Sequence, residues 1–200
     1  GDYFDFIPLP DGRLAIAVGD VSGHGLGAAL YMVQTRSYIR GQAALGLGAG
    51  EMLTRVNNLL CSDLTDGTFV TLFLAILDPV SAELTWSSAG HEGFRILADN
   101  SDESIDATGL VLGVMPNIEY LQQSLTLRSG EILFLPTDGF AEAMNEEKEL
   151  FGRDRMLRQV ASTRNHSASE MIDLLCGACR DFAGTMSIKD DMTCVLIKVE

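Results

Sequence analysis

The stretch TFVTLFLAILD, residues 68–78, decides the fold of this chain of 200 residues. Both faces of an extended strand with this sequence are apolar, whereas a strand with one solvated face alternates apolar and polar residues. We therefore expect a central strand that is covered on both sides. Upstream, YFDFIPLPDGRLAIAVGD (residues 3–20) predicts two strands around a Pro-Asp-Gly turn.

Two helices are predicted between these strands and the central one, separated by the glycine-rich LGLGAG (residues 45–50). Their apolar faces comprise Leu26, Ala29, Leu30 and Val33 in the first helix, and Met52, Val56, Leu59 and Leu60 in the second.

Downstream of the central strand, four more strands are predicted within residues 83–90, 93–98, 119–127 and 131–138. RSG (residues 128–130) is a tight-turn signal that predicts a hairpin between the last two, and DNSDES (residues 99–104) predicts a polar, mobile loop. After Asp138 we expect about three helices, one of them opened by the capping box Ser167-x-x-Glu170, and then a closing strand at 191–199. The buried stripe of the capped helix is expected to be Met171, Leu174, Leu175, Ala178 and Phe182.

This order of elements lacks regular βαβ alternation, which argues against a doubly wound parallel sheet. It fits an α+β fold with two antiparallel sheets flanked by helices, in a four-layer α/β/β/α sandwich. A chain of this length can bury its own core as a single domain, residues 1–200.

Charge and composition exclude several classes of function. With 14 Lys and Arg against 28 Asp and Glu, the net charge is −14, which argues against nucleic acid as a partner. No apolar run is long enough to span a bilayer, and no signal peptide is visible. We therefore expect a cytoplasmic protein with no membrane partner, whose four cysteines stay reduced.

Acidic residues recur where the predicted strands begin or end. They are Asp2 and Asp5 around the start of the first strand, Asp20 and Asp138 at strand ends, and Asp190 and Asp191 before the last strand. In antiparallel sheets the end of one strand lies beside the start of its neighbour, so these carboxylates can meet at one edge. Such a group needs protons or cations to coexist, and oxygen ligands select Mg²⁺ or Mn²⁺. The pattern predicts a two-metal site for phosphoester hydrolysis, although any single Asp also fits a turn or cap.

The glycine-rich GDVSGHG (residues 19–25) is neither a P-loop, which requires a lysine, nor a nucleophile elbow, because Asp20 stands where G-x-S-x-G needs glycine. Ser22 is expected to shape the loop. His24 either contacts phosphate or water at a metal site or begins the helix. His91 either makes a structural hydrogen bond or serves the site, and Glu142 fits an acid at a helix N-terminus.

Six segments in order, GDYFDF, GDVSGHG, TFVTLFLAILD, SAGH, TDGFAEAMN and DDMTCVLIKV, resemble bacterial SpoIIE-type serine phosphatases of the PPM, or PP2C-like, superfamily. The resemblance implies the α/β/β/α sandwich and two Mn²⁺ or Mg²⁺ ions. It implies Asp20 as the bridging ligand, with the Val21 carbonyl on the second ion and Asp138 and Asp190 on the first. Other matched positions are Asp2 near the second ion, Asp5 as a weaker candidate, Asp191 as the less favoured neighbour of Asp190, and Glu142 as a regulatory or outer-sphere group.

The same resemblance implies a function in signal transduction of the two-component and stress-response kind. Proteins similar to this one dephosphorylate phosphoserine on STAS-domain anti-anti-sigma factors, through a metal-bridging hydroxide, behind a receiver, PAS or other sensor domain. The resemblance is compatible with a homodimer and implies that this chain is the C-terminal part of a longer regulatory protein. The segment Ser88-Ala-Gly-His91-Glu-Gly departs from the familiar N-A-G-H-x-P but keeps His91. The alternative is a catalytically inactive module of the same fold that binds and sequesters a partner.

Overall fold

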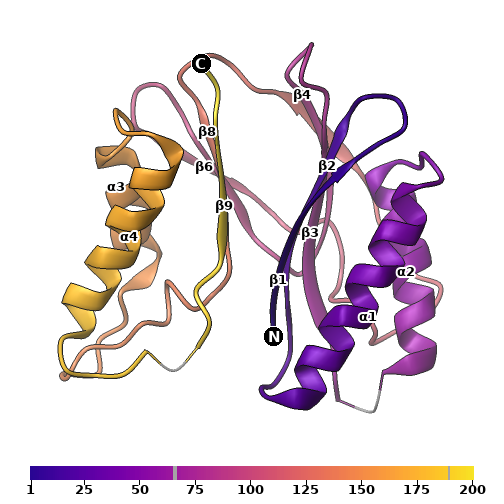
Figure 1. Cartoon of the computed structure of the whole chain (residues 1–200), viewed down its shortest axis with the longest axis horizontal. Helices are drawn as coiled ribbons and strands as arrows, with labels where there is room; N and C mark the ends of the chain where they lie inside the picture. Colours follow the sequence, from indigo (N-terminus) through magenta and orange to yellow (C-terminus); the bar gives the residue numbers. More distant parts are fainter. Residues whose placement is uncertain (65–66, 189) are drawn as a thin grey trace. The chain divides into compact units, whose positions relative to one another are not determined.

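The computed structural model describes residues 1–64, 67–188 and 190–200, which fall into two units (Figure 1). The first unit comprises residues 1–92 and 105–128, and the second comprises residues 93–104 and 129–200. Each unit combines an antiparallel sheet with a pair of helices. The helices of the described residues include none that is both long enough and apolar enough to cross a membrane.

The sheet of the first unit is built around the predicted central strand. Its strands, in spatial order, are β1 (Asp2–Pro8), β2 (Leu14–Val21), β3 (Val70–Leu77), β4 (Glu83–Ala89) and β7 (Gln123–Thr126), and every neighbouring pair is antiparallel. Leu72 and Leu74 of β3 belong to the core beneath the helices, while Phe73 between them is equally buried on the other face. The prediction of a central strand buried on both faces is therefore confirmed.

Helices α1 (Leu26–Ala43) and α2 (Ala49–Asp63) cover one face of this sheet (Figure 1). The predicted apolar face of α2 is largely buried, but that of α1 is not, since Leu26 is 77% and Leu30 62% exposed. The buried face of α1 instead carries Ile39 and small residues such as Ala28 and Ala43. The expected orientation of α1 was wrong because the face that packs into the core of this unit is the one that carries these small residues and Ile39.

The second unit has a sheet of its own, in the spatial order β6 (Asp102–Ile105), β5 (Gly93–Ile96), β8 (Ile132–Pro136) and β9 (Cys194–Lys198). Its helices are α3 (Gly152–Ser162) and α4 (Ala168–Ala183). The predicted capping box opens α4, because Ser167 and Glu170 each accept a hydrogen bond from the backbone N–H of the other. The buried stripe of α4 includes Met171 and Leu175, as predicted, but Leu174 is 40% exposed.

Three local predictions for the second half of the chain were wrong. Residues 99–104 are not a plain loop, because a turn in which Asp99 Oδ1 accepts from Ser101 N (3.0 Å) leads into β6. RSG does not close a hairpin, since β7 pairs with β4 and β8 pairs with β5 and β9. After Asp138 the described residues form two helices rather than three, because residues 138–142 make only a single turn, with Glu142 N donating to Asp138 O at 2.9 Å.

Candidate metal centre

Asp2 and Asp20 lie directly opposite each other on β1 and β2. Directly opposed side chains share one face of a sheet, with Cβ atoms about 4.5–5.5 Å apart. Their face is the one away from α1 and α2, because the flanking Tyr3 and Val21 point into the core beneath the helices. Two carboxylates at this spacing repel each other, so a proton or a cation between them is favourable.

The backbone beside Asp20 leaves room for a small ligand set but not for an extra side chain. Val21 N donates to Gly1 O at 3.3 Å. A Cβ at Gly1 would lie only 2.4 Å from Val21 O and 2.7 Å from Asp20 Oδ1. A glycine here therefore keeps the Val21 carbonyl and the Asp20 carboxylate unobstructed, which suits the two oxygen ligands predicted at this point.

Ser22 ties the loop that follows to the start of the central strand. Ser22 N donates to Phe69 O (2.9 Å), and Ser22 Oγ accepts from Phe69 N (3.0 Å). The loop then passes through Gly23 and Gly25, whose φ values of 92° and 82° favour glycine, and Gly25 caps α1. The contacts of Ser22 are those of a loop-shaping residue, as predicted, and His24 beside it is exposed.

In the second unit, Asp138, Glu142 and Asp190 form another group of carboxylates. Burial, and then the negative charges of Asp138 and Asp190, raise the pKa of Glu142 above its ordinary value. The neighbouring Asp191 donates its backbone N–H to Asp190 Oδ1 at 2.9 Å. The negative charges of Asp138 and Asp190 thus act on Glu142, although burial is the larger cause of its raised pKa.

The contact between β8 and the segment before β9 brings these residues together. Thr137 N donates to Thr193 O (2.8 Å), and Thr193 N donates to Thr137 Oγ1 (3.1 Å). A Cβ at Gly139 would come within 1.9 Å of Asp191 O. Because glycine lets the two segments approach this closely, Asp138 and Asp190 lie near each other although they are far apart in the sequence.

The chemistry of the donors fits a hard divalent cation, because carboxylate and carbonyl oxygens are the ligands that Mg²⁺ and Mn²⁺ prefer. Within residues 1–64, 67–188 and 190–200, however, no group of three or more His, Cys, Asp or Glu side chains is placed to hold a metal ion. The predicted ligands occur instead in two groups, Asp2 with Asp20 in the first unit and Asp138 with Asp190 in the second.

Asp5 lies on the opposite face of β1 from Asp2, since side chains alternate along a strand. Its carboxylate accepts from Arg40 Nη2 and Arg40 Nε, both at 2.6 Å, and from Tyr3 Oη at 3.0 Å. Burial alone would raise the pKa of Asp5, but the hydrogen bonds from Arg40 and Tyr3 and the charges of Arg40 and Arg36 outweigh it and lower the pKa. Asp5 thus joins β1 to α1.

Thr71 is a neighbour of Asp20 that the sequence analysis did not single out. It lies directly opposite Asp20 on β3, and its Oγ1 is 3.2 Å from Nδ1 of the buried His91. The available signal was a lone hydroxyl within the apolar run of residues 69–77. Its significance depended on the register between β2 and β3, which the pattern of residues does not reveal.

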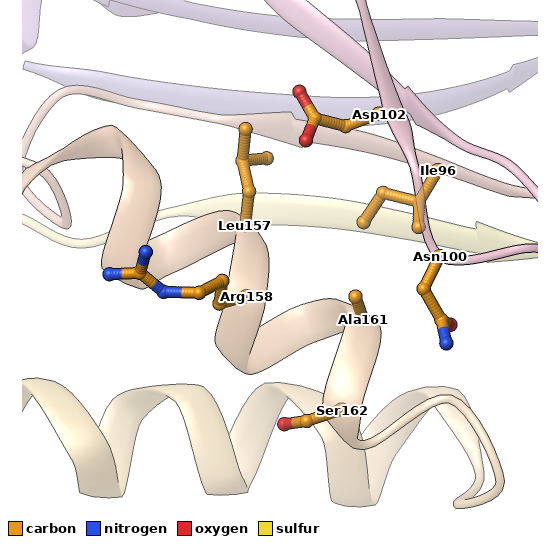
Figure 2. A pocket seen from close by; sticks show the side chains of 7 residues that line it. All are labelled: Ile96, Asn100, Asp102, Leu157, Arg158, Ala161 and Ser162. Carbon is orange, nitrogen blue, oxygen red and sulfur yellow. The ribbon is translucent and has the colours of Figure 1, made fainter.

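A separate hollow of about 370 Å³ lies in the second unit between α3 and the β5–β6 hairpin (Figure 2). Figure 2 shows Leu157 on the side of the helix towards Asp102, and Arg158 extending away from Ile96. The lining residues are Ile96, Asn100, Asp102, Leu157, Arg158, Ala161 and Ser162. They include none of the carboxylates discussed above, so this hollow is distinct from the candidate metal centre.

Two curated proteins and one solved structure illustrate what the chain resembles. Protein IcfG of Synechocystis is 31% identical, over 88% of this chain and 32% of its own length. Phosphoserine phosphatase RsbU of Bacillus subtilis is 28% identical, over 99% of this chain and 59% of its own length. The chain therefore spans less than two thirds of either relative. The SiaA-PP2C domain of Pseudomonas aeruginosa superposes with a TM-score of 0.88 at 19% identity, over 100% of this chain and 80% of that one.

The structural similarity confirms the predicted fold class, two antiparallel sheets flanked by helices as in PP2C-like domains. The model of the family described as Stage II sporulation protein E (SpoIIE) matches residues 10–200. Since that match covers nearly the whole chain, this protein belongs to the SpoIIE family, among PP2C-type bacterial serine phosphatase domains.

Proposed function

We propose that the chain is a metal-dependent protein serine/threonine phosphatase domain that hydrolyses phosphoserine on a regulatory protein. The observation that carries the proposal is the pairing of Asp2 with Asp20, in a chain that also groups Asp138 with Asp190. The relative RsbU is named a phosphoserine phosphatase. Carboxylates this close to each other repel unless a proton or a cation offsets their charge, and two metal ions would do so.

The residues that would hold the ions are Asp2, Asp20 and the Val21 carbonyl from the first unit, with Asp138 and Asp190 from the second. Asp191 is the alternative to Asp190. Two Mn²⁺ or Mg²⁺ ions would supply a water of lowered pKa as nucleophile and positive charge for the phosphoryl oxygens. RsbX, whose structure resembles this chain with a TM-score of 0.70 at 16% identity, was solved in complex with magnesium.

The chain itself has to hold its carboxylates ionised and correctly oriented. The ladder between β1 and β2 fixes Asp2 against Asp20, and the contact of Gly139 with the Asp191 carbonyl fixes Asp138 near Asp190. Ser22 anchors the loop after Asp20 to the start of β3. The cations would also offset the net charge of −14, which otherwise repels a phosphorylated substrate.

For the substrate we propose the phosphoserine of a STAS-domain anti-anti-sigma factor, in a cytoplasmic two-component or stress-response pathway. Residues 1–200 would form a single phosphatase domain at the C-terminal end of a longer protein with an upstream sensor or receiver domain, and the protein could act as a homodimer. The support is the family and the fact that the chain spans only 32% and 59% of IcfG and RsbU.

The experiment is phosphate release from a phosphoserine-containing STAS protein with Mn²⁺ present. Asp20→Asn and Asp138→Asn should each lower the rate by more than about 100-fold. The reason is that losing a residue that merely supports a metal ligand already costs about 10–100-fold, and these residues are predicted to be ligands themselves. Asp106→Asn is the matched control, because Asp106 is an exposed carboxylate that is not among the predicted ligands. Full activity in Asp20→Asn would refute the mechanism. Tight binding of the STAS protein without turnover, at saturating Mn²⁺, would favour the sequestering module instead.

A further inference from the structure

A row of polar residues crosses one end of the sheet in the first unit. Asp2 on β1 lies opposite Asp20 on β2, and Asp20 lies opposite Thr71 on β3. Opposed residues share a face, so these three side chains are consecutive neighbours on the face away from α1 and α2. We call Asp2, Asp20, Thr71 and the histidine bonded to Thr71 the polar row.

His91 ends the row in a fixed position. It is 6% exposed, and its Nδ1 lies 3.2 Å from Thr71 Oγ1. Its backbone is held as well, because Ser88 Oγ accepts from His91 N (3.3 Å) and donates to His91 O. The imidazole of His91 is therefore held in place where it contacts Thr71, as a positioning group requires.

The hydrogen-bonding capacities of the three groups suggest how the row is connected. An ionised carboxylate only accepts, a threonine hydroxyl has one proton to donate, and a neutral imidazole can donate from Nδ1. If Nδ1–H of His91 donates to Thr71 Oγ1, the hydroxyl proton of Thr71 is left to point towards its neighbour on β2. That neighbour is Asp20, whose ionised carboxylate can only accept.

Resting on the proposed function, we propose that Thr71 and His91 are positioning residues for Asp20. His91 orients the hydroxyl of Thr71, and this hydroxyl orients the Asp20 carboxylate for a divalent cation. Carboxylates that bind metals are themselves commonly hydrogen-bonded, and removing such an outer partner typically costs about 10–100-fold in metal affinity or activity. Neither residue touches the substrate in this scheme.

A purely structural role for the same hydrogen bond makes a different prediction. If the bond serves only to satisfy two buried polar groups, its loss lowers the stability of the fold and leaves the affinity for metal unchanged. Metal affinity therefore separates the two roles, and melting temperature as a function of Mn²⁺ concentration measures it without any substrate.

The test compares Thr71→Val, which removes the hydroxyl, with Thr71→Ser, which keeps it. We expect Thr71→Val to raise the apparent Kd for Mn²⁺ about 10–100-fold, and Thr71→Ser to restore most of the affinity. Thr85→Val is the matched control. Thr85 lies on the neighbouring strand β4 opposite Ile76, whose side chain belongs to the core under the helices, so Thr85 is on the other face of the sheet from the polar row. With a phosphoserine substrate, Thr71→Val should lower kcat and leave KM unchanged.

A double-mutant cycle tests whether the two residues act as one unit. His91→Leu should weaken Mn²⁺ binding in the same direction as Thr71→Val, and His91→Asn should recover part of it because its amide can donate as Nδ1–H does. The Thr71→Val/His91→Leu protein should bind no more weakly than Thr71→Val alone, since coupled residues are not additive. Fully additive losses would contradict the relay from His91 through Thr71.

The outcomes for this inference and for the proposed function are distinguishable. If the unmodified chain is stabilised by Mn²⁺, Asp20→Asn is not, and Thr71→Val is stabilised like the unmodified chain, the positioning role is overturned and the phosphatase proposal stands. If Mn²⁺ fails to stabilise even the unmodified chain, the metal centre is overturned and the positioning role with it.

Discussion

Arg40 of α1 holds Asp5 of β1 through two hydrogen bonds of 2.6 Å each, while Arg36 one turn earlier lies 3.6 Å from the same carboxylate. This contact ties α1 to β1, while Leu26, Leu30 and Val33 of the same helix are exposed. Asp5 lies three residues after Asp2 on β1, so the two side chains lie on opposite faces of the sheet. The helix that follows the Asp20 loop is thus anchored to the strand that carries Asp2.

Removing this anchor should destabilise the first unit. Asp5→Asn loses the ionic character of hydrogen bonds that are worth about 1.5–3 kcal/mol when one partner is charged, so we expect the free energy of unfolding in urea to fall by about 2 kcal/mol. Asp11→Asn is the control, because the pair of Asp11 and Arg13 is exposed and such pairs contribute about 0–1 kcal/mol. Equal losses in the two variants would contradict a special role for Asp5.

The contribution of Asp5 should depend on pH in a defined direction. Its pKa in the folded chain is lowered, because the bonds from Arg40 and Tyr3 outweigh burial. A lowered folded pKa means that the stabilisation is complete above the unfolded pKa of Asp, about 3.9, and is lost as pH falls through the folded value. The difference in unfolding free energy between the unmodified chain and Asp5→Asn should therefore be constant near pH 7 and shrink below about pH 4. A difference that grew on acidification would have the wrong sign.

Gly139→Ala should impair the second carboxylate group. The added methyl would lie 1.9 Å from Asp191 O, so the segment carrying Asp190 and Asp191 has to move. We expect phosphatase kcat/KM to fall at least about 10-fold, as for other losses of support around a metal site. Gly177→Ala, in the interior of α4 with nothing near its Cβ, should keep full activity and gain about 0.5–1 kcal/mol of stability. Normal activity in Gly139→Ala would show that this close approach does not matter.

The capping box of α4 should contribute to stability alone. Ser167→Ala removes the acceptor for Glu170 N and the hydroxyl that donates to Glu170 Oε2 at 2.7 Å. Loss of such a cap costs about 1 kcal/mol, measurable as a lower urea midpoint with unchanged slope. Activity at a temperature well below the melting point should be unchanged, and a large loss of activity would place α4 in the function of the site.

Metal removal should lower the stability of the unmodified chain. A ligand that binds only the folded state at 100 times its Kd adds about 2.7 kcal/mol, so EDTA should lower the melting temperature and Mn²⁺ should restore it. Asp106→Asn should respond in the same way, whereas Asp20→Asn should respond weakly or not at all. Identical melting curves in EDTA and in millimolar Mn²⁺ would contradict the candidate metal centre.

The amino-acid sequence was sufficient for the parts of the fold that depend on local pattern. A short apolar run without alternation that is rich in β-branched and aromatic residues favours a strand covered on both faces, which identified residues 68–78 as the central strand. The pattern Ser167-x-x-Glu170 before an apolar stripe predicted a capping box, and Ser167 does cap α4. The six ordered motifs likewise identified the family. These features hold because the physical cause lies within a few residues of the effect.

Tertiary structure decided what depends on partners distant in the sequence. The pattern placed Leu26, Leu30 and Val33 on one helical face, but the core of the first unit buries the opposite face of α1, which carries Ala28, Ile39 and Ala43. It suggested Asp2 and Asp5 together, but the alternation of β1 puts them on opposite faces. Thr71 gained its place beside Asp20 only from the register of β2 and β3. Periodicity identifies the elements of a chain, whereas register and helix rotation are set by long-range contacts that a linear pattern does not contain.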